Sequence, residues 1–246
     1  MYAGGFDPRI RRLPISVYTE ETHMRSLGNR LELVAEMIHT YSPFRCLADI
    51  GSDHAFIAVR AVKNGDAAFA VASDLREGPL EHGRANAASA GVGNIDFRLS
   101  DGFDALGDYA FDCACICGMG GELIAEILRR YGPHPDCRFL LQPMTAQDDL
   151  RRFLWENGYA IREERFTCER GKPYAILAAD FSGEKTAYCY ADLFLGQKRP
   201  QTDAFRSYAE KTRSQAEKRR TGLLARGMDP SGEDALLAVI DRLLET

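Results

Sequence analysis

The stretch from Leu47 to Phe56 constrains the fold of this chain more than any other. An apolar run, 44–50, leads directly into a short polar turn, and an apolar helical pattern follows the turn. This order predicts a strand, a ligand-binding loop and a helix. An open α/β sheet begins a nucleotide crevice in the same way.

The loop departs from the fingerprint of dinucleotide-binding proteins. After Gly51, the next glycine positions hold Asp53 and Ala55. Two carboxylates, Asp49 and Asp53, stand where a pyrophosphate requires helix N–H groups and no negative charge. The acids therefore disfavour a dinucleotide and favour a nucleoside that carries a positive charge. S-adenosyl-L-methionine, with its sulfonium and α-ammonium groups, is the common ligand of this kind.

Strand and helix patterns alternate through the rest of residues 25–182. An amphipathic helix from Leu27 to Ile38 precedes the first strand. The expected strands are 44–50, 67–73, 95–99, 111–116 and 138–142, and then the two strands of a hairpin, 159–168 and 174–181. This order predicts an α/β fold with a mostly parallel, doubly wound sheet and an antiparallel last strand.

Polar and small residues follow three of these strands. Asp74 lies 21 residues beyond Asp53, where an open α/β sheet places the acid that binds ribose hydroxyls. The third strand ends in Asp101 and Gly102, which suit an adenine amino group and a close approach of the backbone to the ring. The fourth strand ends in Cys117-Gly118-Met119-Gly120-Gly121. So many glycines remove side chains, which predicts the second substrate there.

Each of these residues also has a purely structural alternative. Asp49 and Asp53 can be a helix cap and a surface acid, and Asp74 can cap a strand end. His54 beside a helix start can be a capping or packing residue rather than a catalytic base. Cys117 can be a small buried residue rather than a reactive thiol.

Residues 183–246 show helical patterns and no strand pattern. We expect a helical hairpin of roughly 60 residues that packs on itself or on the sheet, with Ser231 and Asp234 forming a capping box. The segment 198–226 has nine Lys/Arg and three acids and carries +6, whereas the remainder of the chain carries −11. This asymmetry indicates a polyanionic partner, and a solvated helix face is the alternative.

Several classes of protein are disfavoured. No window approaches the ~18 consecutive apolar residues of a membrane span, and the N-terminus lacks the order of a signal peptide, so we expect a cytoplasmic protein without membrane contact. The seven cysteines contain no Cys-x-x-Cys pair, so no metal site is expected. Residues 1–24 are expected to form a loose arm. We also expect a monomer.

Five motifs in this order resemble a known family, the bacterial tRNA (adenine-22-N1)-methyltransferases or TrmK family, which are class I enzymes dependent on S-adenosyl-L-methionine. The resemblance runs from about Leu27 to Phe181. It is carried by residues 49–56, Ser73-Asp74 with Gly78-Pro79, Asp101-Gly102, residues 118–121, and Leu140-Leu141-Gln142-Pro143.

The resemblance implies a Rossmann-like class I methyltransferase sheet with a C-terminal helical, coiled-coil-like domain that binds tRNA. It implies that Asp49, Gly51 and Asp53 hold the methionine end of the donor, Asp74 the ribose, and Asp101 with Gly102 the adenine. The full set for the donor is Asp49, Gly51, Ser52, Asp53, Asp74, Leu75, Asp101, Gly102, Cys117, Gly118 and Met119. The set for tRNA is Arg30, Gly120, Gly121, Lys198, Arg199, Lys218, Arg219 and Arg220.

The acceptor chemistry needs little from the protein. Residues 118–121 occupy the place where related adenine methyltransferases keep an Asn/Asp-Pro-Pro-aromatic motif, which this chain lacks. Adenine N1 already has a free lone pair, so orientation does most of the work. The product is cationic, and we expect Asp53 to stabilise that charge, with His54 as second choice.

Three other functions remain as alternatives. The first is a methyltransferase that acts on a small molecule, and the second is a non-catalytic RNA-binding protein with a relic donor pocket. A dehydrogenase is a distant third, because the loop is acidic.

Overall fold

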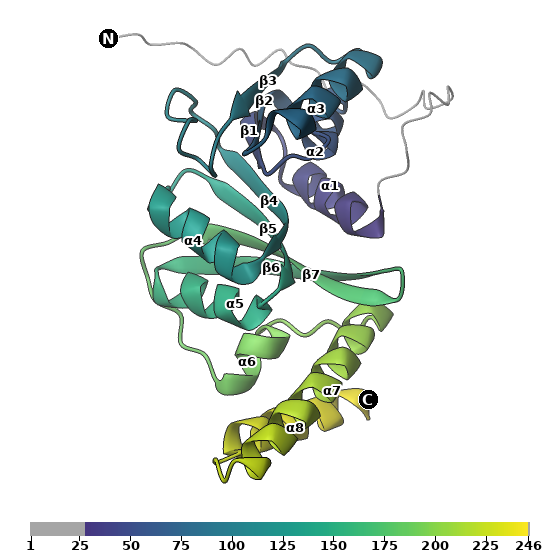
Figure 1. Cartoon of the computed structure of the whole chain (residues 1–246), viewed down its shortest axis with the longest axis vertical. Coiled ribbons are helices and arrows are strands. Elements are labelled where there is room, and N and C mark those ends of the chain that lie inside the picture. The colour runs from purple at the N-terminus through teal and green to yellow at the C-terminus, as the bar shows by residue number, and fades with distance from the viewer. Residues whose placement is uncertain (1–27, 246) are drawn as a thin grey trace.

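A computed structural model describes residues 28–245 as a seven-stranded sheet covered by helices (Figure 1). The strand order is β3-β2-β1-β4-β5-β7-β6. The five strands β1 to β5 pair with one another in parallel, whereas β7 is antiparallel to both β5 and β6. The predicted fold class is confirmed. The strands are β1 (Phe44–Ile50), β2 (Ala67–Asp74), β3 (Ile95–Leu99), β4 (Cys113–Gly120), β5 (Arg138–Thr145), β6 (Tyr159–Glu169) and β7 (Lys172–Phe181).

Helices cover both faces of the sheet, and each face has its own core. Helices α1 (Asn29–Tyr41), α2 (Phe56–Lys63) and α3 (Glu77–Ser89) cover one face, and α4 (Gly121–Tyr131) and α5 (Gln147–Glu156) cover the other. Strand β4 contributes to both cores. Cys113 and Cys115 face the first set of helices, and Ala114 and Ile116 face the second. This alternation is the period of two that the spacing of the cysteines predicts.

The glycine-rich segment is more regular than the sequence indicates. Strand β4 continues to Gly120 with a register shift after Cys117, and α4 begins at the next residue, Gly121. A Cβ atom on Gly121 would lie 2.1 Å from the carbonyl oxygen of Ala146. Glycine therefore allows the start of α4 to lie directly against the chain that follows β5.

The C-terminal helices pack on the sheet and on one another. They are α6 (Tyr190–Leu195), α7 (Asp203–Ala225) and α8 (Ser231–Leu244). Near the start of α7, Phe205 and Tyr208 lie with ring centroids 4.9 Å and 5.0 Å from that of Phe166 on β6. Farther along, Ala216 packs with Leu236 and Ile240 of α8 in a separate core. Both expected modes of packing are therefore present.

A buried arginine links the helical tail to the sheet. Arg151 of α5 and Glu164 of β6 are almost fully buried, and Arg151 Nε lies 2.8 Å from Glu164 Oε1. The same guanidinium donates to the carbonyl oxygens of Leu193 (2.8 Å) and Phe194 (3.2 Å) in α6. The tail thus supplies hydrogen-bond acceptors to the Arg151 guanidinium. Removing the tail would leave these N–H groups without those acceptors.

The predicted capping box at Ser231 is wrong. Ser231 is the first residue of α8, and its hydroxyl donates to Asp229 (2.8 Å), which also accepts from the Ser231 N–H. The Asp234 carboxylate pairs with Arg220 instead. The first N–H of α8 is therefore satisfied by Asp229, which lies just before the helix, and not by a capping box.

Some expectations fall outside the described residues, among them the N-terminal arm and Leu27. Within residues 28–245, no helix combines the length and the apolar character needed to cross a membrane.

Candidate active site

The candidate site lies at the carboxyl ends of β1 and β4, where the strand order reverses. Strand β1 pairs with β2 on one side and with β4 on the other, and Ile50 is in register with Ile116. Because the chain leaves these two strands in opposite directions, a crevice opens between the loops that follow them. The donor loop follows β1, and the glycine-rich segment ends β4.

The donor loop is held by short polar contacts. Gly51 has φ +71°, and a Cβ atom there would lie 2.0 Å from Met119 Cε. The Ser52 N–H donates to the Ser73 carbonyl oxygen (2.8 Å), and the Ser52 hydroxyl donates to Asp49 Oδ2 (2.7 Å). The left-handed backbone conformation therefore requires glycine at position 51, whereas the flexible end of Met119 packed over it could move aside.

Asp49 is a buried carboxylate without a positive partner. Only 5% of the residue is exposed, and burial raises its pKa from 3.8 to about 6. Hydrogen bonds from the Ser52 hydroxyl and the Ala58 N–H oppose that rise in pKa. No Lys or Arg among residues 28–245 lies within ion-pair distance of Asp49. A ligand with an ammonium group fits this position, because it would supply the missing charge.

The other predicted donor residues lie on the neighbouring strand ends. Asp74 is largely buried, and its Oδ1 accepts from the Arg76 N–H (2.9 Å), while no group of the described chain donates to Oδ2. Leu75 beside it is 65% exposed. Asp101 is engaged by Arg130 at 2.8 Å and 3.1 Å, and this guanidinium lowers the pKa of Asp101.

Gly102 and Cys117 take mainly structural positions. Gly102 has φ +59°, and a Cβ atom there would lie 3.0 Å from Ile127. The pKa of the Cys117 thiol is raised, first by burial and then by the charge of Asp49. A thiol with a raised pKa is a poor nucleophile at neutral pH.

Asp53 and His54 lie at the opening of the donor loop. The Asp53 side chain is 70% exposed, and its Oδ2 lies 3.5 Å from His54 Nε2. The imidazole of His54 stacks on His82 (5.1 Å between centroids) and lies near Phe56 (5.3 Å). These contacts describe a packed histidine with one ring nitrogen near a carboxylate.

A buried amide that was not among the predicted site residues contacts the glycine-rich segment 118–121. We call this segment the acceptor end of the site, because the second substrate is predicted there, and we call the loop after β1 with the neighbouring strand ends the donor end. Gln142 on β5 is fully buried, and its Oε1 accepts from the Gly118 N–H (3.1 Å) and from Arg30 Nη1 (2.5 Å). Its Nε2 donates to the Pro143 carbonyl oxygen (3.0 Å). Arg30, on the first turn of α1, is thereby fixed beside Gly118. The available signal was a lone polar side chain at the end of an otherwise apolar strand.

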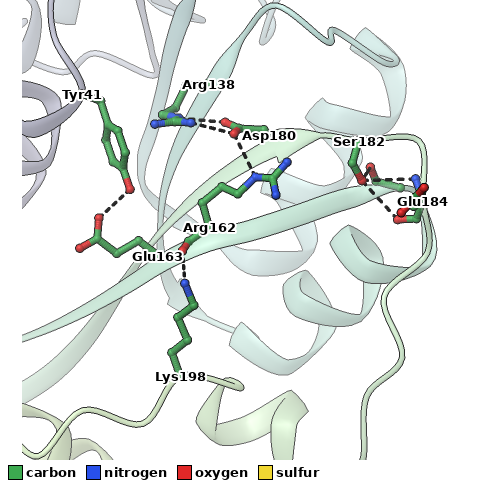
Figure 2. A network of polar contacts seen from close by, with 9 residues as sticks. Tyr41, Arg138, Arg162, Glu163, Asp180, Ser182, Glu184 and Lys198 are labelled. Atoms are coloured by element: carbon green, nitrogen blue, oxygen red, sulfur yellow. Dashed lines mark hydrogen bonds and ion pairs between the residues drawn. The ribbon is translucent and has the colours of Figure 1, made fainter.

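The five basic residues predicted to bind phosphate differ in their surroundings. Arg199 pairs with Asp192 (2.6 Å), Arg219 pairs with Glu233 (2.7 and 3.0 Å), and Arg220 pairs with Asp234. Lys198 donates to the backbone carbonyl of Arg162, beside the Arg138–Asp180 pair, as Figure 2 shows. Lys218 is exposed and has no polar partner in the described chain. These residues do not lie with the donor loop.

No group of three or more possible metal-ligating side chains (His, Cys, Asp or Glu) occurs among residues 28–245.

Known proteins are similar to this chain in sequence and in fold. The methyltransferase-domain family matches residues 27–177. The Bacillus subtilis tRNA (adenine(22)-N(1))-methyltransferase is 34% identical over 168 residues, which are 66% of this chain and 68% of that protein. The crystal structure of B. subtilis TrmK, an m1A22 tRNA methyltransferase, covers 89% of this chain and 96% of its own at 26% identity, with a TM-score of 0.71.

Mycoplasma capricolum TrmK, solved with the cofactor product S-adenosyl-homocysteine, covers 89% of this chain and 95% of its own at 25% identity, with a TM-score of 0.68. The family match spans more than half of this chain, and the curated relative is matched over more than two thirds of its length. The chain therefore belongs to the methyltransferase-domain family and, within it, to the tRNA (adenine(22)-N(1))-methyltransferases.

Proposed function

We propose that this chain transfers the methyl group of S-adenosyl-L-methionine to N1 of an adenine in tRNA, the adenine at position 22. The observation that carries the proposal is Asp49, a buried carboxylate without a counter-charge among residues 28–245, at the switch point of the sheet and beside the glycine-rich segment 118–121. The relatives named for this reaction support the target.

The donor end fits the charges and hydroxyls of S-adenosyl-L-methionine, which supplies an electrophilic methyl group on its sulfonium. Asp49 would neutralise the α-ammonium group, and the Oδ2 of Asp74 would accept from a ribose hydroxyl. Leu75, exposed beside Asp74, would offer apolar surface to the adenine ring.

The acceptor end has to orient a base rather than activate it. Adenine N1 lies on the Watson–Crick edge, so the target base must leave its stack before it reacts. Gly118 and Gly120 leave room for it, and Gln142 holds Arg30 at the edge of that space. The Asp53 carboxylate would offset the positive charge that develops on the base, with His54 as second choice.

The function is tested with the full chain, labelled donor and unmodified tRNA. We expect label in the tRNA and a reverse-transcription stop at one adenine, which a substitution of that nucleotide abolishes. Consumption of donor without tRNA would instead identify a small-molecule methyltransferase. Retention of tRNA without transfer would identify a binding protein with a relic pocket.

The role of Asp53 is tested separately. Asp53→Asn is expected to slow methyl transfer at saturating donor and tRNA, because the developing charge loses its partner. An unchanged rate would remove Asp53 from the chemistry and direct attention to His54.

The proposed substrate also indicates where in the cell the protein acts. An acceptor of this kind places the chain in the cytoplasm, and we propose that it acts as a monomer. Light scattering on the free protein tests the oligomeric state.

A further inference from the structure

The basic residues of the helical tail are largely neutralised by the tail itself. Arg213 on α7 lies 2.7 Å from Asp241 of α8 and 2.8 Å from Glu217. Arg219 and Arg220 pair with two further acids of α8, Glu233 and Asp234. The positive run in the sequence therefore does not form an equally positive surface. An RNA phosphate would have to compete with carboxylates for these arginines.

A different set of cations has no such partners. The turn between β6 and β7 carries Arg170 and Lys172, and both side chains are exposed. Neither side chain has a hydrogen bond or an ion pair within residues 28–245. The acid beside them, Glu169, faces away from them, because its carboxylate accepts from the Arg30 N–H (3.0 Å) at the start of α1.

A third cation lies on helix α7, three residues beyond Tyr208, whose ring centroid lies 5.0 Å from that of Phe166 on β6. Lys211 is half-buried and has no ion pair in the described chain. Burial lowers its pKa, and the positive charge of Lys172 lowers it further. The fold thus holds two lysines close enough to repel one another. An anion bound between them would relieve both the repulsion and the desolvation.

This turn lies close to the acceptor end of the active site. Asn29 Nδ2 donates to the Cys168 carbonyl oxygen (2.8 Å), and Glu169 accepts from Arg30, so the hairpin is joined to the first turn of α1. Arg30 in turn reaches Gln142 beside the glycine-rich segment. Figure 1 shows the β6–β7 hairpin projecting between α1 and the start of α7. Arg30 therefore links the two places, because its backbone N–H contacts the hairpin and its guanidinium contacts the acceptor end of the active site.

We propose that Arg170, Lys172 and Lys211 form a phosphate-binding site, the hairpin-tip site, which holds the tRNA backbone beside the target nucleotide. The inference rests on the proposed function and adds the surface that positions the substrate. Phosphate contacts fix the register of a nucleic acid on a protein. A base turned out of its stack needs its flanking backbone held while it reacts.

The test compares two matched double variants of the full chain. In K172Q/K211Q two of the three charges of the site are removed. In K63Q/K185Q two exposed lysines that have no polar partner within residues 28–245 are changed, one at the end of α2 and one between β7 and α6. Binding of tRNA is measured at a series of salt concentrations, together with donor binding. For K172Q/K211Q we expect a Kd for tRNA raised about tenfold or more and a salt slope shallower by about 1.4–1.8, as the loss of two phosphate contacts predicts.

The control variant K63Q/K185Q and the donor Kd of all variants should match the wild type. Because Lys211 is half-buried, R170Q/K172Q serves as a second variant that changes exposed side chains only, and it should also weaken tRNA binding and flatten the salt slope. Wild-type affinity and slope in both site variants would overturn the proposal.

Failure of the proposed function would look different. A wild-type chain that binds tRNA but forms no 1-methyladenosine would contradict the methyl transfer. The salt slope would still report on the hairpin-tip site, because binding needs no transfer.

Discussion

The donor end and the acceptor end of the site lie side by side on one sheet edge, yet they are built differently. The proposed donor end has two buried carboxylate side chains, Asp49 and Asp74. The proposed acceptor end has the glycines of residues 118–121 and one buried amide, Gln142, which accepts from the Gly118 N–H. A cationic cofactor can be selected by charge, whereas a neutral base has to be selected by space and orientation.

The largest expected effect separates the acceptor end from the donor end. Arg30→Ala should lower kcat/KM for tRNA about 100-fold, because the group that Gln142 holds beside the base is lost. The donor Kd should stay unchanged in the same variant. Steady-state methylation and calorimetric donor binding measure the two quantities.

The coupling between Arg30 and Gln142 sharpens this test. Gln142→Leu removes the acceptor of both Arg30 and the Gly118 N–H, so it should reproduce much of the loss. If Gln142 acts through Arg30, the R30A/Q142L variant should be little worse than R30A alone. If the fold-losses in kcat/KM of the two single variants multiply in the double variant, the two residues act independently.

The next effect belongs to the donor end. Asp49→Asn should raise the donor Kd about 10–100-fold, because a hydrogen bond to a charged group contributes about 1.5–3 kcal/mol. The Kd for tRNA should not change. A weakened tRNA affinity with normal donor binding would contradict the division between the two ends.

The pH dependence of donor binding follows from the same carboxylate. Burial raises the pKa of Asp49 to about 6, so a donor that needs its ionised form should bind about tenfold more weakly for each pH unit below 6. Without donor, Asp49 affects the stability of the fold in the opposite direction, since ionising a buried acid destabilises the folded state. The contribution of Asp49 to the free energy of unfolding, measured as the difference between the wild type and Asp49→Asn, should therefore fall as pH rises from about 4 to about 6. The pH dependence of donor binding that comes from Asp49 should be absent in Asp49→Asn.

The smallest expected effects are changes in stability caused by substituting two glycines of the acceptor end. Gly118 has φ +80°, so Gly118→Ala should lower stability by about 1–2 kcal/mol through backbone strain, although an added Cβ atom would meet, among residues 28–245, only Arg30 Nη1, at an ordinary contact distance of 3.9 Å. Gly120 has φ −68°, and an added Cβ atom would lie 3.3 Å from Thr145 Oγ1. Gly120→Ala should change stability by less than about 0.5 kcal/mol. Thermal unfolding of both variants decides whether backbone conformation or space requires glycine here.

The sequence predicts the donor end better than the acceptor end. A strand, a glycine turn and a nearby acid are local features, so the position of Asp49 before Gly51 can be inferred from a short window. The contact between Arg30 and Gln142 joins residues 112 positions apart, and no local pattern indicates it. The roles of these residues toward donor and tRNA stay predictions.

For a similar reason, the charge of +6 counted over residues 198–226 overestimates the positive charge that the folded helical tail presents. The window that ended at Arg226 left out Glu233 and Asp241, which neutralise Arg219 and Arg213 once α8 folds back on α7. The mostly parallel sheet with its antiparallel last strand was predictable because alternating strands and helices admit few topologies.

The buried Arg151 guanidinium has a consequence for how the helical tail is attached. Bending between the sheet and α6 would break the hydrogen bonds from this guanidinium to the carbonyl oxygens of Leu193 and Phe194, and it would leave a buried charge with fewer partners. The junction between the sheet and α6 is therefore a braced joint rather than a free hinge.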